Sequence, residues 1–251
     1  MNKFKLALVS AAAAALLVPA AAQAQLSATP AVAVHTEHPL MPPAETQSQL
    51  SFNIGAVSLY KSSGVDQNWT EGKNSKNFSP AIQGGVDYAF SNGFYVGNWN
   101  STGKFSDANL EIDLYAGLRG ELTKDLNYDV GFARYIYPSS GGGWNGNEVY
   151  FSLSYAGFLT KITRGVSGSI DQHTRFSLGY TRPLSDKLTL TAGLGLRDDH
   201  AGNFDDYSLG LSYDLGNALS LSGNLAGATK KDEDSKNRRD NRLMVGISKS
   251  F

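Results

Sequence analysis

The sequence predicts an all-β protein, a transmembrane antiparallel up-and-down β-barrel of about 12 strands. Three observations lead to this fold class. From Ser51 onward, apolar residues recur at every second position, which places them on one face of a strand. The connections between these segments are alternately short and long. Residues 1–24 have the pattern of a secretory signal peptide.

The N-terminal residues fall into two parts before the alternating pattern begins. A positively charged start, the apolar run Leu6–Val18 and a small-residue cleavage site ending at Ala24 predict a signal peptide over 1–24. Residues 25–50 carry four of the eight prolines and show no period, which predicts a proline-rich periplasmic linker or tail. We therefore expect the barrel to occupy 51–251.

The composition excludes several other classes of protein. Of the 251 residues, 41% are hydrophobic and 18% charged, which is too apolar for a chain disordered along its length. A mean hydropathy of -0.27 argues against a bundle of membrane helices. The absence of cysteine excludes a disulfide scaffold and a thiolate metal site. A net charge of -1 gives no sign of a nucleic-acid partner.

The period of two is clearest in Leu110–Arg119, where every even position is apolar and odd positions include Glu111, Asp113 and Arg119. The same alternation recurs along the rest of the chain. The predicted strands cover 51–60, 80–90, 93–101, 109–121, 125–137, 147–155, 158–165, 172–182, 187–197, 204–214, 219–228 and 241–251.

The connections between these strands form two groups. The short ones are 91–92, 122–124, 156–157, 183–186 and 215–218. The long and polar ones are 61–79, 102–108, 138–146, 166–171, 198–203 and 229–240. Short periplasmic turns and longer outer loops are typical of outer-membrane barrels. We therefore expect the outer membrane of a Gram-negative bacterium, with both chain ends on the short-turn side.

A soluble barrel or β-sandwich would turn its apolar face inward to a core. Here the polar face carries charges, glycines and small hydroxyl residues, which suit a polar lumen, so the apolar face is expected to contact lipid. The charged residues of the polar face are our candidates for lining that lumen. They are Glu111, Asp113, Arg119, Asp129, Glu148, Arg175, Lys187 and Asp206.

Such a lumen predicts a porin through which small hydrophilic solutes diffuse passively, filtered by size and charge. The alternative is that paired charges cross-link the interior, which would give a non-conducting barrel with a structural or adhesive role. A lipid hydrolase would need a serine beside a histidine. His173 and Ser177 lie about 13 Å apart along a strand, too far for that contact. We expect no catalytic residues, and no motif for a nucleotide, a metal or another cofactor is present.

The last strand predicts an assembly signal. Leu243, Val245 and Ile247 alternate before the terminal Phe251, and Gly246 precedes the end. We expect the outer-membrane assembly machinery to read Gly246 and Phe251, although Lys249 stands where an apolar residue is usual. The other expected partners are outer-membrane lipid and lipopolysaccharide, the latter through basic residues of the loop 230–240.

Aromatic residues gather near both ends of the predicted strands, which suggests two membrane-interface belts. The set beside the short turns and the terminus is Phe90, Phe94, Tyr155, Phe158, Tyr180, Tyr213 and Phe251. The set toward the long loops is Trp99, Tyr135, Tyr137, Tyr150, Phe204 and Tyr207.

Several segments resemble the TorF family of porins. The segments are PAIQGGVDYAFSNGFYVGNWNS from Pro80 to Ser101, LEIDLYAG from Leu110 to Gly117, YDVG from Tyr128, YIYP from Tyr135 and the closing SKSF. The segment Ser63–Thr70 is a looser match, because Lys61–Gly64 stands where an arginine-rich stretch is usual in the family. The resemblance covers about 51–251 and implies an outer-membrane barrel, without indicating a substrate or a binding residue.

Overall fold

A computed structural model describes residues 48–69, 76–198, 204–229 and 238–251. The chain forms a closed, antiparallel barrel of 12 long strands, as the sequence predicts. Three short strands, β2 to β4, lie in the connection that follows the first long strand. Among the described residues there is no helix long and apolar enough to cross a membrane.

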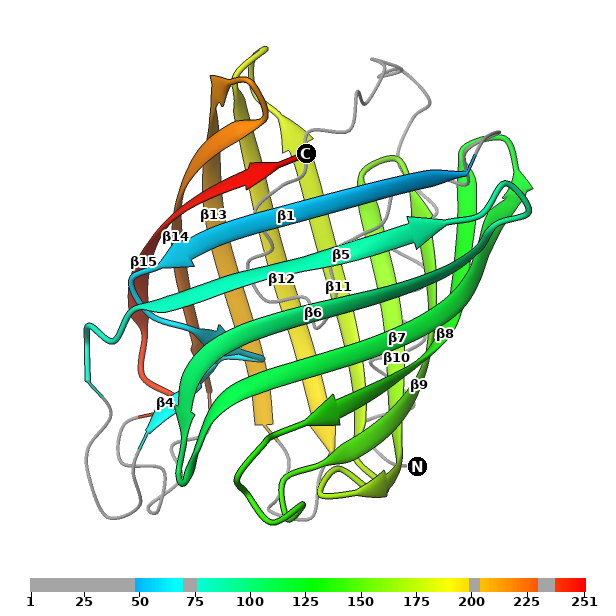
Figure 1. Cartoon of the computed structure of the whole chain (residues 1–251). Coiled ribbons are helices and arrows are strands. Elements are labelled where there is room, and N and C mark those ends of the chain that lie inside the picture. Colours follow the sequence, from blue (N-terminus) through cyan, green and yellow to red (C-terminus); the bar gives the residue numbers. More distant parts are fainter. Residues whose placement is uncertain (1–47, 70–75, 199–203, 230–237) are drawn as a thin grey trace, which may run out of the picture.

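The long strands follow one another around the barrel in chain order (Figure 1). Their bounds are β1 Gln49–Val57, β5 Ala81–Ala89, β6 Phe94–Phe105, β7 Ala108–Thr123, β8 Leu126–Ile136, β9 Gly146–Tyr155, β10 Phe158–Gly168, β11 Thr174–Pro183, β12 Leu188–Asp198, β13 Phe204–Gly216, β14 Leu219–Ala228 and β15 Arg242–Ser250. The short strands are β2 Lys61–Ser62, β3 Val65–Asp66 and β4 Asn68–Trp69.

The barrel closes where β15 pairs with β1, in the register Asn53↔Ser250 to Val57↔Gly246. Beyond this ladder, the backbones of Phe52 and Phe251 exchange two hydrogen bonds, with N···O distances of 3.1 and 2.9 Å. The first and last strands therefore leave no open edge between them, which satisfies the backbone polar groups of both.

The period of two separates the outside of the barrel from the inside. On β7 the outward Leu110, Leu114 and Leu118 are exposed, whereas the alternating Glu111 and Asp113 are buried. Ten other long strands keep apolar side chains exposed on the outer face in the same way, whereas the outward apolar residues of β11 are half-buried. Exposed examples are Ile54, Ile82, Val96, Val130, Phe151, Ile162, Leu194, Leu209, Leu221 and Val245.

The turns at one end of the barrel are short, as predicted. Two of them are two-residue turns with positive φ at both positions, Ala156–Gly157 (51° and 84°) and Asn217–Ala218 (52° and 54°). Such mirror-image turns match the right-handed twist of the strands that they join.

The opposite end differs from the prediction at one connection. The expected loop 102–108 is only Ser106 and Asp107, because β6 and β7 extend farther and pair until Phe105↔Ala108. The prediction that short and long connections alternate strictly is therefore wrong for the connection between β6 and β7.

The N-terminal boundary of the barrel lies two residues before the expected Ser51, since β1 begins at Gln49. The predicted signal peptide and nearly all of the predicted tail lie outside the described residues.

Only one of the two predicted aromatic belts has the expected orientation. At the short-turn end, Phe94, Tyr155 and Phe251 are exposed on the outside of the barrel. At the other end, Tyr135 and Tyr150 are buried on the inward parity of their strands, whereas Tyr207 has the outward parity of β13, so most of that belt is wrong. Alternate residues of a strand point to opposite faces of the sheet, so a residue near the end of the barrel can still point inward.

Candidate functional site

One side of the barrel interior is filled by tyrosines and carboxylates from β5 to β9. We call this set the tyrosine–carboxylate wall, and it consists of Tyr95, Tyr115, Tyr135, Tyr137, Tyr150, Asp87, Glu111, Asp129 and Glu148. Tyr95 is only 1% exposed, so the phenol rings pack as a core rather than line an open channel.

Glycines on neighbouring strands make room for these rings. Tyr95 of β6 lies directly opposite Gly117 of β7, and Tyr150 of β9 lies opposite Gly131 of β8. Gly117 and Gly131 are themselves cross-strand partners. A Cβ atom at either glycine would collide with the tyrosine ring beside it. The rings of Tyr95 and Tyr150 therefore lie over Gly117 and Gly131 and approach each other from opposite sides. Their hydroxyl oxygens are 2.5 Å apart.

Each carboxylate of the wall accepts a hydrogen bond from a tyrosine hydroxyl. Tyr95 donates to Asp129 at 2.6 Å and Tyr135 donates to Glu148 at 3.1 Å. The other two pairs are Tyr115 with Asp87 and Tyr137 with Glu111. A hydrogen bond to an ionised acceptor is stronger than one between neutral groups, which offsets part of the desolvation of these acids.

The substitution Tyr95→Phe removes one hydroxyl and keeps the ring. We expect the free energy of unfolding to fall by about 1–3 kcal/mol, because Asp129 and the Tyr150 hydroxyl lose a shared partner in a buried site. Urea titration of the barrel in lipid vesicles measures this change. Tyr155→Phe is the matched control, since Tyr155 is 40% exposed on the outer face. Equal stability of the two variants would show that the Tyr95 hydroxyl contributes nothing to the wall.

The opposite side of the interior is built from small residues. We call it the small-residue wall, and its inward members on β11 to β13 are Ser177, Gly179, Thr181, Thr191, Gly193 and Ser208. All of them are half-buried, so they retain accessible surface on the inside of the barrel. A Cβ atom added at Gly179 would meet only Leu159, at 3.8 Å or more. The interior is therefore less tightly filled beside Gly179 than at the tyrosine–carboxylate wall.

Basic side chains border the small-residue wall. Arg175 of β11 reaches across Gly195 of β12 to Asp206 of β13, with three N···O distances of 2.8–3.2 Å. The two side chains are 11% and 9% exposed. Lys161 of β10 lies 4.3 Å from the centre of the Tyr150 ring. Charges of both signs therefore occur on both sides of the interior, since Arg119 of β7 lies within the tyrosine–carboxylate wall, 5.6 Å from the centre of the Tyr95 ring.

The structure brings most of the predicted lumen residues to the inside. Glu111, Asp113, Arg119, Glu148 and Asp206 are buried, and Asp129 and Arg175 are half-buried.

Lys187 is the exception among the predicted lumen residues. It lies in the turn 184–187 and is exposed at the end of the barrel, because β12 begins only at Leu188.

The two residues of the predicted assembly signal lie on the closing strand and just after it. Gly246 is buried on β15, and Phe251 is 68% exposed. Their recognition by the assembly machinery remains a prediction.

Sequence reasoning missed the inward tyrosines and two basic residues, Lys161 and Arg197. Parity was the available signal, because Tyr115 shares the odd positions of β7 with Glu111 and Asp113. Among the described residues, no group of three or more histidine or acidic side chains is arranged to hold a metal ion.

Comparison with known proteins relates the chain to one family and to a group of barrels. A family model described as "Bacterial protein of unknown function (Gcw_chp)" matches residues 43–251. No curated protein sequence matches. That family's description does not carry the TorF name, so the finer resemblance remains an expectation.

Among solved structures, the KdgM porin aligns with a TM-score of 0.55 at 10% identity, over 80% of this chain and 99% of that one. The KdgM porin in complex with disordered oligogalacturonate aligns with a TM-score of 0.53 at 10% identity, over 81% and 99%. At this level of identity the likeness concerns the fold, which is that of an outer-membrane porin barrel.

Proposed function

The chain belongs to the Gcw_chp family of bacterial proteins of unknown function, and from its porin-like barrel we propose that it is an outer-membrane channel for small hydrophilic solutes. Solutes would cross by passive diffusion, with no covalent step. The observation that carries the proposal is the small-residue wall, which keeps accessible polar surface inside a barrel whose outer face is apolar. The location is the outer membrane of a Gram-negative bacterium, reached through a cleaved signal peptide.

The charges of the interior would filter solutes. The inward charges include the carboxylates Glu111 and Glu148 and the cation Lys161, so a solute beside the small-residue wall would meet charges of both signs. The KdgM porin has been solved with an acidic oligosaccharide, oligogalacturonate. Its likeness to this chain supports a hydrophilic solute and does not define which one.

The test is electrical conductance of the purified, folded protein in planar lipid bilayers. We expect stepwise currents, and we expect Ser177→Trp to reduce the step by about half or more, since a bulky ring there would enter the lumen. Phe176→Trp is the matched control, because Phe176 is the neighbouring residue on the outward parity of β11. A heat-modifiable, folded protein without current steps would contradict the proposal.

One observation favours the second candidate, a non-conducting barrel with a structural or adhesive role. The tyrosine–carboxylate wall and an inward-folded connection after β1 fill part of the interior. Under this alternative, Ser177→Trp would change nothing, and none of the variants would carry current.

A further inference from the structure

The connection after β1 folds back into the barrel instead of extending outward. Leu59 packs against Ala226 and Met244, which are inward residues of β14 and β15. The next residue, Tyr60, packs against the rings of Trp99 and Phe105 on β6, at centroid distances of 5.8 and 6.4 Å. These strands lie on opposite sides of β1, so the segment crosses the inner face of the barrel wall.

The segment continues as a small hairpin formed by β2 and β3, Lys61–Asp66, which we call the inward hairpin. Its tip lies against β13 and β14, since a Cβ atom at Gly64 would meet the backbone oxygen of Gly227 at 2.5 Å and the Cβ atom of Asp206 at 2.9 Å. Asp206 is the partner of Arg175 beside the small-residue wall. With Tyr60 beside β6 and the tip of the inward hairpin beside β13, residues 60–66 cross the inside of the barrel and occupy part of the lumen.

A buried ion pair holds this hairpin together. Lys61 and Asp66 are both 0% exposed, and the Lys61 Nζ atom lies 2.6 Å from an Asp66 carboxylate oxygen. The same ammonium donates to the carbonyl oxygens of Gly64, at 2.8 Å, and Arg238, at 3.0 Å. Burial lowers the pKa of the Lys61 ammonium, and the Asp66 carboxylate opposes that shift. The ammonium is thus desolvated, and Asp66 is the carboxylate that contacts it directly, whereas Asp240 attracts it more weakly.

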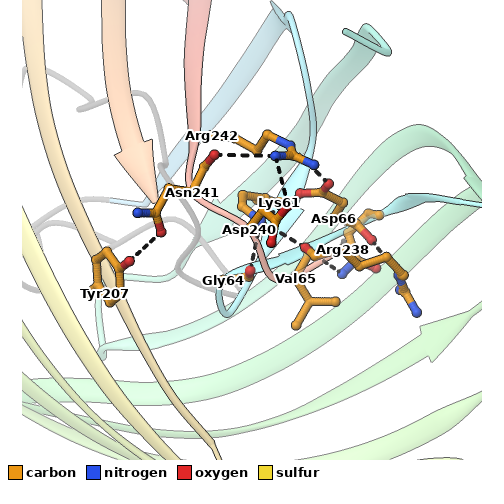
Figure 2. Close-up of polar contacts among 10 residues, drawn as sticks. Lys61, Gly64, Val65, Asp66, Tyr207, Arg238, Asp240, Asn241 and Arg242 are labelled. Carbon is orange, nitrogen blue, oxygen red and sulfur yellow. Dashed lines mark hydrogen bonds and ion pairs between the residues drawn. The ribbon is translucent and has the colours of Figure 1, made fainter. Parts of the chain in front are cut away.

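Asp66 also ties the hairpin to the segment that precedes β15 (Figure 2). Its backbone N–H donates to the Arg238 carbonyl at 2.8 Å, and the Arg238 Nε atom donates to the Asp66 carbonyl at 3.1 Å. The second carboxylate oxygen lies 3.6 Å from Arg242 Nε. One residue therefore joins the ion pair, the hairpin backbone and the outer part of β15.

We propose that the inward hairpin is the constriction that limits the size of solute this channel passes, and that Asp66 is the residue that holds it in place. The inference rests on the proposed channel function. Loss of the Asp66 charge leaves Lys61 buried without its counter-ion, and the favourable outcome for an ammonium in that state is to move into water. The hairpin would then leave the lumen, and larger solutes would pass.

The experiment compares Asp66→Asn with Asp240→Asn in the full-length protein. Both substitutions remove one carboxylate near Arg242, but the side chain of Asp240 is 27% exposed, so its ion pair contributes little. For Asp66→Asn we expect the single-channel step to rise roughly twofold and vesicles to swell in sugars too large for the wild type. Asp240→Asn is expected to match the wild type in both measurements.

A second readout follows the hairpin itself. The chain has no cysteine, so Ser63→Cys introduces a single thiol at a position that is 2% exposed. We expect a maleimide to label this thiol about tenfold faster or more when Asp66→Asn is added, and no faster with Asp240→Asn. Ser139→Cys, in an exposed turn of the connection after β8, gives the rate for an accessible thiol.

The outcomes separate this inference from the channel function. Faster labelling with an unchanged step and sugar cut-off would show that the hairpin moves without being the constriction. An unchanged labelling rate would show that Asp66 does not hold the inward hairpin in the lumen. Either result in a wild-type protein that conducts overturns the inference alone. Replacement of Lys61–Asp66 by a glycine–serine linker, giving a folded but silent barrel, would overturn the channel function as well.

Discussion

Substitution of Asp206 by asparagine is expected to lower the free energy of unfolding by about 3–5 kcal/mol, because it leaves the Arg175 guanidinium buried without its counter-ion. Arg175 makes three hydrogen bonds to this carboxylate, and both side chains are about one-tenth exposed. Arg175→Gln should destabilise the barrel similarly from the other side. Urea titration in lipid vesicles, followed by the heat-modifiable band on gels, measures both variants.

The double variant Arg175→Met with Asp206→Leu distinguishes two causes of the lost stability. One is an unpaired buried charge, and the other is the loss of the ion pair itself. Replacement of both members of a buried pair by apolar residues is often close to neutral, so we expect the double variant to recover most of the lost stability. If each single variant is as stable as the wild type, water in the lumen screens the pair and it has no structural role.

Substitution of Gly117 by alanine is expected to lower the free energy of unfolding by about 1–3 kcal/mol, through overpacking. The new methyl group would collide with the ring of Tyr95 and approach the backbone oxygen of Val130 at 2.7 Å. Tyr95 cannot retreat easily, because its hydroxyl is held by Asp129 and Tyr150. The same unfolding measurement applies.

Gly223→Ala provides the control for this prediction. Gly223 is also in a long strand, β14, but no atom lies within 4 Å of an added Cβ atom there. We expect its stability to equal or slightly exceed that of the wild type, since alanine restricts the unfolded chain more than glycine does. A Gly117→Ala barrel as stable as the Gly223→Ala barrel would show that the tyrosine ring moves aside without loss.

Local pattern was enough to predict the strands and their two faces. The alternation of Leu110, Leu114 and Leu118 with Glu111 and Asp113 depends only on strand geometry and on the apolar exterior. For this reason the 12 strands and the inward acids are found where the sequence places them. The same parity would have identified Tyr115 as an inward residue.

Contacts between residues distant in the chain could not be predicted in this way. The inward hairpin depends on Asp66 meeting Arg238 and Arg242, which follow it by more than half the chain. The pairing of Arg175 with Asp206 needs the relative heights of two strands separated by β12. Likewise, Lys187 is exposed because the turn before β12 ends one residue later than predicted. The alternation of residues does not fix a strand boundary to better than one or two positions.

The pairing of β1 with β15 has a consequence for the order of folding. These two strands come from opposite ends of the barrel sequence, so their pairing requires the longest loop closure in the molecule. Every neighbouring hairpin can form earlier from local contacts, whereas the ladder between β1 and β15 needs the last strand to be present. Folding should therefore end with a slow closing step, and a chain that loses Arg242–Ser250 should stop as an open sheet with two unpaired edges, prone to aggregation.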